Sequence, residues 1–255
     1  MKIRWIVAMV LAYLLFLVAT APASWAAYGL SRASHGQLVL VGPRGSLWQG
    51  RGTLQMRVLA GSRALGTLRW TLHPAALLLG TLTASIRLDG PVRAHLRLAR
   101  SLRELRVTQA LVVARGSALS ALSPEIRLVG PAGLLRLQVP RLVLTAQAAQ
   151  GHGTLAWSDA GLALSHVRPL GSYELQFQSQ GGALGLVLQT LSGPLAVAGR
   201  GSLQAAGNFA FAGTMAVPDA DPRLVRLLQF VGTPSANNTR HFRISGQGPG
   251  WNQLF

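Results

Sequence analysis

Beyond about residue 50, the chain alternates apolar and polar residues with a period of two. The segments 53–58, 67–72, 81–88, 92–98 and 172–180 each place apolar residues on one side and Thr, Arg, Ser or Gln residues on the other. In one of them, Leu68, Trp70 and Leu72 alternate with polar neighbours. This period predicts antiparallel strands with one buried and one solvated face. We therefore expect a mainly β protein with a curved antiparallel sheet, either sandwich-like or an open half-barrel.

Glycines mark the places where these strands begin or turn. The triplet Gly-(Ser/Thr)-Leu occurs six times, starting at Gly45, Gly52, Gly66, Gly80, Gly153 and Gly201. A phosphate-binding loop would instead place its glycines between a strand and a long helix. Alternation, not a helical pattern, follows Gly52, so the glycines indicate strand starts and bends. We expect Trp48, in the same stretch, to be an apolar plug on the inner face of the sheet.

Two short helices interrupt the strand pattern. Pro74 is suited to the first helical position and Gly80 to the stop of a helix over 74–80. A second helix should start at Asp221 as N-cap and end at Gly232, with Leu224 on its apolar face. Residues 101–113 remain ambiguous, because Ser101 and Glu104 suit a capping box whereas the valines that follow favour a strand.

The first residues predict a membrane segment. Residues 5–27 carry no charge, and 23 helical residues span roughly 35 Å, enough to cross a bilayer core. Aromatic residues stand near both ends, where membrane interfaces favour them. The residues expected to contact the membrane are Trp5, Leu11, Leu15, Phe16 and Trp25. A cleaved signal peptide, with Ala21 and Ala23 at its cleavage site, is the alternative, but the uncharged run is longer than such peptides usually carry.

This segment sets the expected domain organisation. Residues 1–27 would form an N-terminal membrane anchor consisting of one transmembrane helix, and residues 28–255 a periplasmic β-rich domain. Lys2 and Arg4 favour an N-terminus on the cytoplasmic side, and long domains translocate largely regardless of the charges that follow. The bulk of the chain is therefore expected outside the cytoplasm.

Basic residues are concentrated in the first half of the chain. Of 255 residues, 24 are Lys or Arg and 7 are Asp or Glu, which gives a net charge of +17. Residues 28–141 contain sixteen arginines and three carboxylates, whereas the balance is slightly acidic over 142–222. Such a surface attracts anionic lipids, acidic proteins or nucleic acid, or is simply solvated. The candidate contacts with an anionic partner are Arg87, Arg93 and Arg97.

Little in the sequence points to catalysis. There is no cysteine, the six histidines lack metal-ligand spacing, and no G-x-S-x-G motif occurs. Helix capping accounts for Asp219 and Asp221 better than acid–base chemistry does. Few aromatics accompany the arginines, which argues against nucleic-acid binding. We therefore expect no enzyme, cofactor, metal site, nucleic-acid partner or small-molecule substrate; an envelope hydrolase is kept only as a remote third class.

Six stretches follow the expected N-terminal anchor in a fixed order: GSLWQG at 45–50, LRWTLHPAALLLGTL at 68–82, GTLAWSDAGLAL at 153–164, LGSYELQF at 170–177, the run 191–232 and FRISGQG at 242–248. This succession resembles the type II secretion system protein N (general secretion pathway protein N) family. Within the first two, we select a candidate structural motif of Gly45, Leu47, Trp48, Gly50, Trp70, Pro74 and Gly80. The resemblance implies an inner-membrane protein with its bulk in the periplasm, accessory to export of folded proteins across the outer membrane.

Two functions follow as hypotheses. The first is a non-catalytic component that contacts other type II secretion subunits in the periplasm, where strand addition is a natural mode of contact. The alternative is a periplasmic lipid-binding or lipid-transfer β protein with an apolar groove, in which arginines contact phosphate headgroups.

Overall fold

The computed structural model describes residues 5, 9, 13, 16–58, 61–119, 124–163, 165, 167–219, 221–228, 232–235, 239–248 and 250–254. One 14-stranded sheet makes up most of these residues, and every pairing in it is antiparallel. Its strands are β1 Leu38–Gly45, β2 Gln49–Val58, β3 Gly61–His73, β4 Leu82–Asp89, β5 Val92–Arg100, β6 Glu104–Arg115, β7 Ala132–Thr145, β8 Ala149–Gly161, β9 Gly171–Gln180, β10 Ala183–Ser192, β11 Ala196–Leu203, β12 Asn208–Ala216, β13 Thr233–Pro234 and β14 Thr239–Gln247. The mainly β prediction is confirmed.

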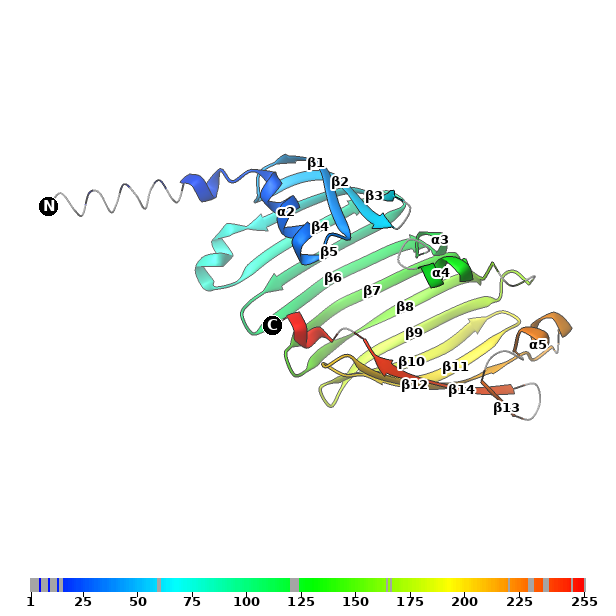
Figure 1. Ribbon diagram of the computed structural model, residues 1–255. Helices are drawn as coiled ribbons and strands as arrows, with labels where there is room; N and C mark the ends of the chain where they lie inside the picture. Colours follow the sequence, from blue (N-terminus) through cyan, green and yellow to red (C-terminus); the bar gives the residue numbers. More distant parts are fainter. Residues whose placement is uncertain are drawn as a thin grey trace.

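Strand order in the sheet follows the chain almost throughout. Strands β1 to β12 lie side by side in sequence order, and only the last two exchange places, since β14 pairs with β12 and β13 lies outside β14. The sheet curls into an open trough (Figure 1). No second sheet packs against it in the described part of the chain, so the open form expected from the sequence is confirmed and the sandwich-like form is wrong.

Bulges help the sheet to curl. The pairing of β5 with β6 shifts between His95 and Arg97, where Gln109 and Ala110 on β6 oppose a single residue on β5. Gln109 adopts a left-handed conformation with φ 52°. An extra residue on one strand bends that strand and increases its twist. Comparable shifts interrupt the β7–β8 and β8–β9 pairings, so curvature is distributed over the middle of the sheet.

Short helices lie at the margins of the sheet (Figure 1). They are α2 Ala23–Ala33, η1 Pro74–Leu79, α3 Gly116–Leu119, α4 Pro124–Val129, α5 Pro222–Leu228 and η2 Trp251–Leu254. Both predicted helices are present: η1 is a 3-10 helix that ends at Gly80 in a left-handed conformation, and α5 begins with Asp221 Oδ1 accepting a hydrogen bond from Arg223 N at 2.8 Å. Leu224 is 1% exposed, as expected for its apolar face.

The ambiguous segment 101–113 forms the turn before β6 and most of that strand. Ser101 Oγ accepts a hydrogen bond from Glu104 N at 3.1 Å, which is the bond a helix N-cap would make. Here the bond closes a turn instead, because the residues that follow pair with β5 on one side and β7 on the other. Tertiary pairing therefore decides between the two sequence interpretations.

The N-terminal prediction can be compared with the structure only in part. No helix among the described residues is long and apolar enough to cross a membrane. Leu11 and Leu15 lie outside the described residues, while Trp5, Phe16 and Trp25 are exposed. The boundary expected after Ala27 falls inside α2, whose Ala23 is 2% exposed and packs with Leu40 and Trp70.

Three apolar clusters hold the margins of the trough. The largest surrounds Tyr173 on β9 and brings together Leu195, Val197, Val217 and Leu224. Because Leu224 belongs to α5, this helix covers the part of the sheet around Tyr173. A second cluster joins η2 to the sheet through Trp251, which packs with Leu144, Ala149 and Leu184. The third is the contact of α2 with Leu40 and Trp70. Burial of these apolar side chains stabilises the contacts of α2, α5 and η2 with the sheet.

Tyr173 provides a test of the largest cluster. Its hydroxyl donates to Leu195 O at 3.0 Å and lies 3.3 Å from Leu170 O, and burial raises its pKa to about 12. We expect Tyr173→Phe to lower the free energy of unfolding by about 1 kcal/mol at neutral pH, because Leu195 O loses the hydroxyl as its donor.

The same substitution should change the pH dependence of stability. The neutral phenol is favoured in the folded state, so its contribution is complete below pH 10 and is lost as the pH rises toward about 12. Tyr173→Phe should lack this alkaline loss. Urea unfolding of both proteins across this pH range measures the difference, and parallel pH profiles would contradict the assignment.

Candidate functional site

The candidate structural motif comes together where the β1–β2 hairpin meets β3. Trp70 on β3 is 7% exposed and donates from Nε1 to Leu47 O at 3.0 Å. A Cβ added to Gly50 would overlap the six-membered ring of Trp70, so glycine leaves the space that the indole fills. Gly45 has φ 100° and closes the hairpin opposite Gly50. Pro74 and Gly80 delimit η1, farther along the chain from Trp70.

Trp48 has a different position from the one expected. Trp70, not Trp48, is the apolar plug in the cluster under α2. Trp48 is only half-buried and donates from Nε1 to Val18 O at 2.8 Å. Leu47 N donates to Ala21 O at 2.7 Å, and Pro22 forms an isolated bridge with Ser46. The hairpin therefore fastens the N-terminal segment to the sheet.

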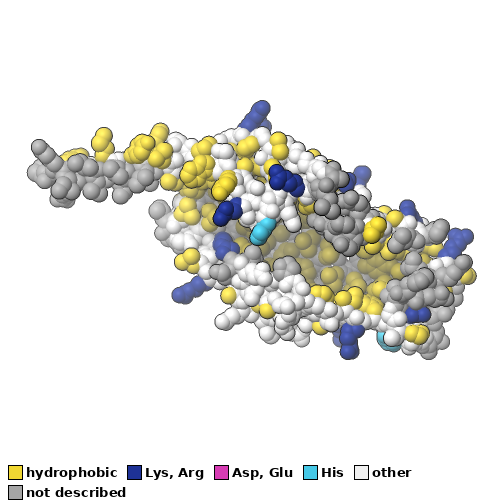
Figure 2. Space-filling model, viewed as in Figure 1, with side chains coloured by type: hydrophobic (Ala, Val, Ile, Leu, Met, Phe, Trp, Pro, Cys, Tyr) yellow, Lys and Arg dark blue, Asp and Glu magenta, His cyan; other side chains and the backbone are white. Residues whose placement is uncertain are grey.

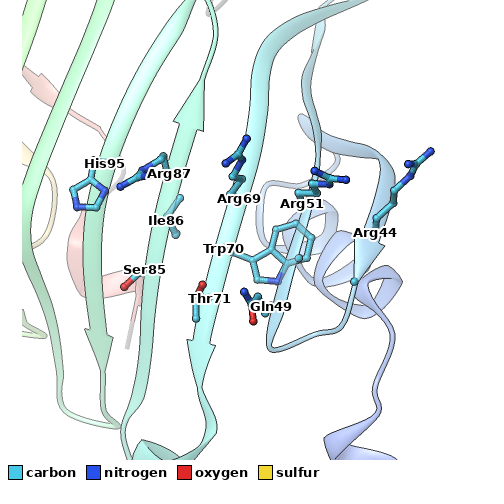
Figure 3. A pocket seen from close by; sticks show the side chains of 12 residues that line it. Arg44, Gln49, Arg51, Arg69, Trp70, Thr71, Ser85, Ile86, Arg87 and His95 are labelled. Atoms are coloured by element: carbon cyan, nitrogen blue, oxygen red, sulfur yellow. The ribbon is translucent and has the colours of Figure 1, made fainter.

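A row of arginines crosses the first four strands on the face opposite α2. Arg44 pairs with Arg51, Arg51 with Arg69, Arg69 with Arg87, and Arg87 with His95 of β5. Figure 3 shows these five side chains following one another across the strands. With about 4.8 Å between strands, the arginine row (Arg44, Arg51, Arg69 and Arg87) extends over roughly 15 Å.

The arginine row is solvated and lacks balancing charge. All four side chains are exposed, and no ion pair is found for them among the described residues. Asp89 is the only carboxylate in residues 38–100 and lies opposite Thr67 on the same face. Like charges directly opposite one another destabilise a sheet by up to about 1 kcal/mol per pair in water. An anion bound along the row would relieve this repulsion.

The row lies along an open depression. The depression has a volume of 670 Å³ and is lined by all four arginines together with polar residues such as Thr71 and Ser85. At its far side, His95 is half-buried, and its Nδ1 is buried without a hydrogen-bond partner among the described residues. These groups offer several donors and no carboxylate, which suits an anionic ligand or surface.

The three arginines predicted to contact an anionic partner lie on this face of the sheet, but only one of them belongs to the arginine row. Arg87 belongs to the row itself. Arg93 and Arg97 flank His95 on β5 and point to the same side of the sheet by alternation. Sequence reasoning missed Arg44, Arg51 and Arg69, because their alignment depends on strand register. The pairing of Gly45 with Gly50, which places Arg44 opposite Arg51, is the one local signal for part of the row.

The opposite face forms the trough and is apolar along its centre. A cross-strand row takes one residue from each strand β3 to β10: Leu68, Leu88, Ala94, Val112, Leu137, Leu155, Leu175 and Leu188. Most of these are half-buried. Figure 2 shows the trough as a hollow with hydrophobic side chains on its floor. The three apolar clusters lie toward its margins, so the middle of this apolar row is left open.

The described residues do not form a metal-binding site. They contain no group of three or more His, Asp or Glu side chains placed to hold a metal ion.

The fit of Trp70 against Gly50 predicts a measurable stability loss. We expect Gly50→Ala to lower the free energy of unfolding by about 1–3 kcal/mol, because the new methyl group displaces the indole. Gly29→Ala in α2 is the matched control: no atom lies within 4 Å of its added Cβ, and alanine should stabilise this exposed helical position by roughly 0.5–1 kcal/mol. Thermal or urea unfolding measures both, and equal stabilities would refute the packing role of Gly50.

Comparison with known proteins gives one match. The family model described as type II secretion system (T2SS), protein N matches residues 36–243, from just before β1 into β14, and covers both the arginine row and the trough. No curated protein and no solved structure matches the chain. Because the family model spans most of the sequence, the chain belongs to the type II secretion system protein N family.

Proposed function

We propose that the chain is a non-catalytic accessory component of the type II secretion system that works by contacting other subunits of the apparatus. Family membership supports the pathway and implies secretion subunits as partners. In this proposal, residues 1–27 anchor the chain in the inner membrane and the sheet lies in the periplasm. The uncharged run over residues 5–27 supports the anchor.

The main structural support for protein contacts is the open outer edge of β14. On one side, β14 pairs with β12 over Thr239–Gln247. On its other side, β13 covers only Arg240 and His241, and no further strand pairs there among the described residues. The end of β14 is exposed, with Ile244 54% accessible. An unpaired, exposed edge is a site where an extended segment of a partner adds a strand.

The opposite edge of the sheet is less available. Helix α2, which precedes β1 in the chain, packs against part of that strand: its residues Ala26, Ala27 and Leu30 contact the cluster of Leu40 and Trp70. Ser34 Oγ accepts a hydrogen bond from Leu38 N at 3.0 Å, which satisfies the first donor of β1. The structure therefore favours β14 over β1 for strand addition.

Site-specific photocrosslinking in cells can test the contact. We expect a photoreactive benzoylphenylalanine in place of Ser245, on the exposed end of β14, to crosslink to another type II secretion subunit. The same group in place of Gln176, exposed on the outer face in mid-sheet, is the control and should give little crosslinking. Deleting the gene that encodes this chain should reduce export of type II substrates. Unchanged export of every substrate, or equal crosslinking at both positions, would count against the proposal.

A second function, binding of lipid acyl chains, is favoured by one observation. The apolar row along the trough continues over eight strands, roughly 34 Å at the usual strand spacing. Backbone groups of the floor are paired within the sheet, and its side chains carry no polar atoms. Such a surface offers a hydrocarbon chain contact without requiring hydrogen bonds, and apolar grooves of this size commonly bind ligands or partners.

Lipid content can test this second function. We expect the purified chain to retain lipids detectable by native mass spectrometry, and Leu137→Asn with Leu155→Asn to remove them, because two amides in mid-trough must be desolvated by a bound acyl chain. Gln138→Asn with Thr154→Asn is the control, since both positions lie on the opposite face of the same strands. Absence of lipid in the unaltered chain, even when lipid is offered, would exclude this function.

A further inference from the structure

Three connections of the sheet meet at the end where the N-terminal segment joins it. They are the β1–β2 hairpin at 45–50, the η1 connection at 74–81 and the β5–β6 turn at 101–103. We call this the hairpin end of the sheet. The bonds from Trp48 and Leu47 to Val18 and Ala21 fix the N-terminal segment at this end. Whatever holds residues 16–22 therefore also determines what the hairpin end faces.

Leucines are unusually exposed at the tips of these connections. Leu102, in the β5–β6 turn, is 93% exposed, and Leu77, in η1, is 44% exposed. Leu17 and Val18, on the attached segment, are also exposed. Several apolar side chains exposed at one end of a soluble surface indicate a site of contact with an apolar partner or a membrane.

Positive charge accompanies these leucines. Arg100 and Arg103 flank Leu102 in sequence, and the arginine row starts beside the hairpin, with Arg44 and Arg51 each one pair from Gly45 and Gly50. Asp89 lies at the far end of β4, and Glu104, at the start of β6, is paired with Arg106 at 2.7 Å. Arg87 lies farther back, because it pairs with His95, seven residues before Leu102. The hairpin end thus combines exposed leucines at its tips with arginines at the hairpin and at the β5–β6 turn.

We infer that the hairpin end rests on an anionic lipid surface, with Leu102 and Leu77 reaching the boundary of headgroups and acyl chains and the arginines contacting lipid phosphates. Leucine tips with arginines behind them match the layering of a bilayer, in which phosphates lie outside hydrocarbon. An acidic protein would account for the arginines but not for the leucines. This inference rests on the proposed membrane anchor, because the anchor brings the hairpin end to the lipid.

The inference predicts a salt-dependent contribution from each arginine at the hairpin end. A basic side chain close to an anionic leaflet strengthens binding about fivefold. Removing three of them should therefore weaken the contact by roughly a hundredfold at low salt. The weakening should fade as ionic strength rises, because exposed charges are screened over about 10 Å at 0.1 M salt.

A single fluorophore can report the contact. The chain contains no cysteine, so Leu102→Cys gives one labelling site for an environment-sensitive NBD group. The labelled full chain would be placed in nanodiscs of phosphatidylcholine alone or with phosphatidylglycerol at roughly one lipid in three. We expect a blue shift and several-fold lower quenching by aqueous acrylamide in the anionic discs only. About 0.5 M NaCl should reverse both changes.

Matched variants make the result specific. Arg44→Gln with Arg51→Gln and Arg103→Gln, all exposed at the hairpin end, should abolish the change at position 102, with the fold checked by circular dichroism. Arg136→Gln with Arg200→Gln and Arg243→Gln removes the same charge from exposed positions on the outer face of β7, β11 and β14 and should leave it intact. A probe introduced by Ser62→Cys, at the β2–β3 turn on the opposite end, should not respond.

The outcomes separate this inference from the anchor on which it rests. A chain retained in both discs, with position 102 equally quenched in each, overturns the lipid contact and leaves the anchor standing. A chain retained in neither disc overturns both. A response of the probe to polyglutamate but not to phosphatidylglycerol identifies an acidic protein as the partner and also overturns the lipid contact.

Discussion

The organisation of this protein depends on one constraint: a wide antiparallel sheet has an apolar face, and no second layer covers that face in the described part of the chain. Most domains bury such a face against another sheet or a layer of helices. Here the described residues supply only short pieces, and these cover the margins: α2 at β1–β3, α5 beside Tyr173, and η2, whose Trp251 packs on Leu144 and Leu184. Curling brings the half-covered face inward and yields a trough whose centre stays open. The trough is thus a direct result of the sheet's single-layer construction.

The two faces of the sheet consequently suit different partners. Inward, leucines from successive strands form a surface with no hydrogen-bonding demand, which suits hydrocarbon or an apolar partner. Outward, the first four strands carry aligned arginines and almost no acid, which suits anions. The same alternation along each strand produces both surfaces, since Arg69 and Arg87 occupy positions between inward residues such as Leu68 and Leu88. Neither surface requires catalytic groups, and this agrees with a role based on contact.

The local features of this fold could be predicted from the sequence, and the non-local ones could not. Alternation identified five of the strands, β2 to β5 and β9, and Pro74, Gly80 and Asp221 marked helix ends because capping and proline geometry act within a few residues. The segment after Ser101 was undecidable, since the hydrogen bond of Ser101 serves a turn as well as a helix and only pairing with β5 and β7 decides. The buried apolar plug expected at Trp48 is Trp70 instead, because burial of either indole depends on where α2 packs against the sheet. Arg44, Arg51 and Arg69 become neighbours only through register, which turn lengths set.

The sequential strand order also bears on how the chain acquires its structure. Each strand from β2 to β12 pairs with the strand immediately before it, so most of these pairings close a short loop and involve little chain entropy; the β6–β7 connection, which contains α3 and α4, is the long exception. With the N-terminus anchored as proposed, the chain can add one hairpin after another to a growing edge. The C-terminal end is the exception, because β14 must reach back past β13 to join β12. Assembly in chain order would therefore end with β14, the strand whose outer edge we propose as the site of partner contact.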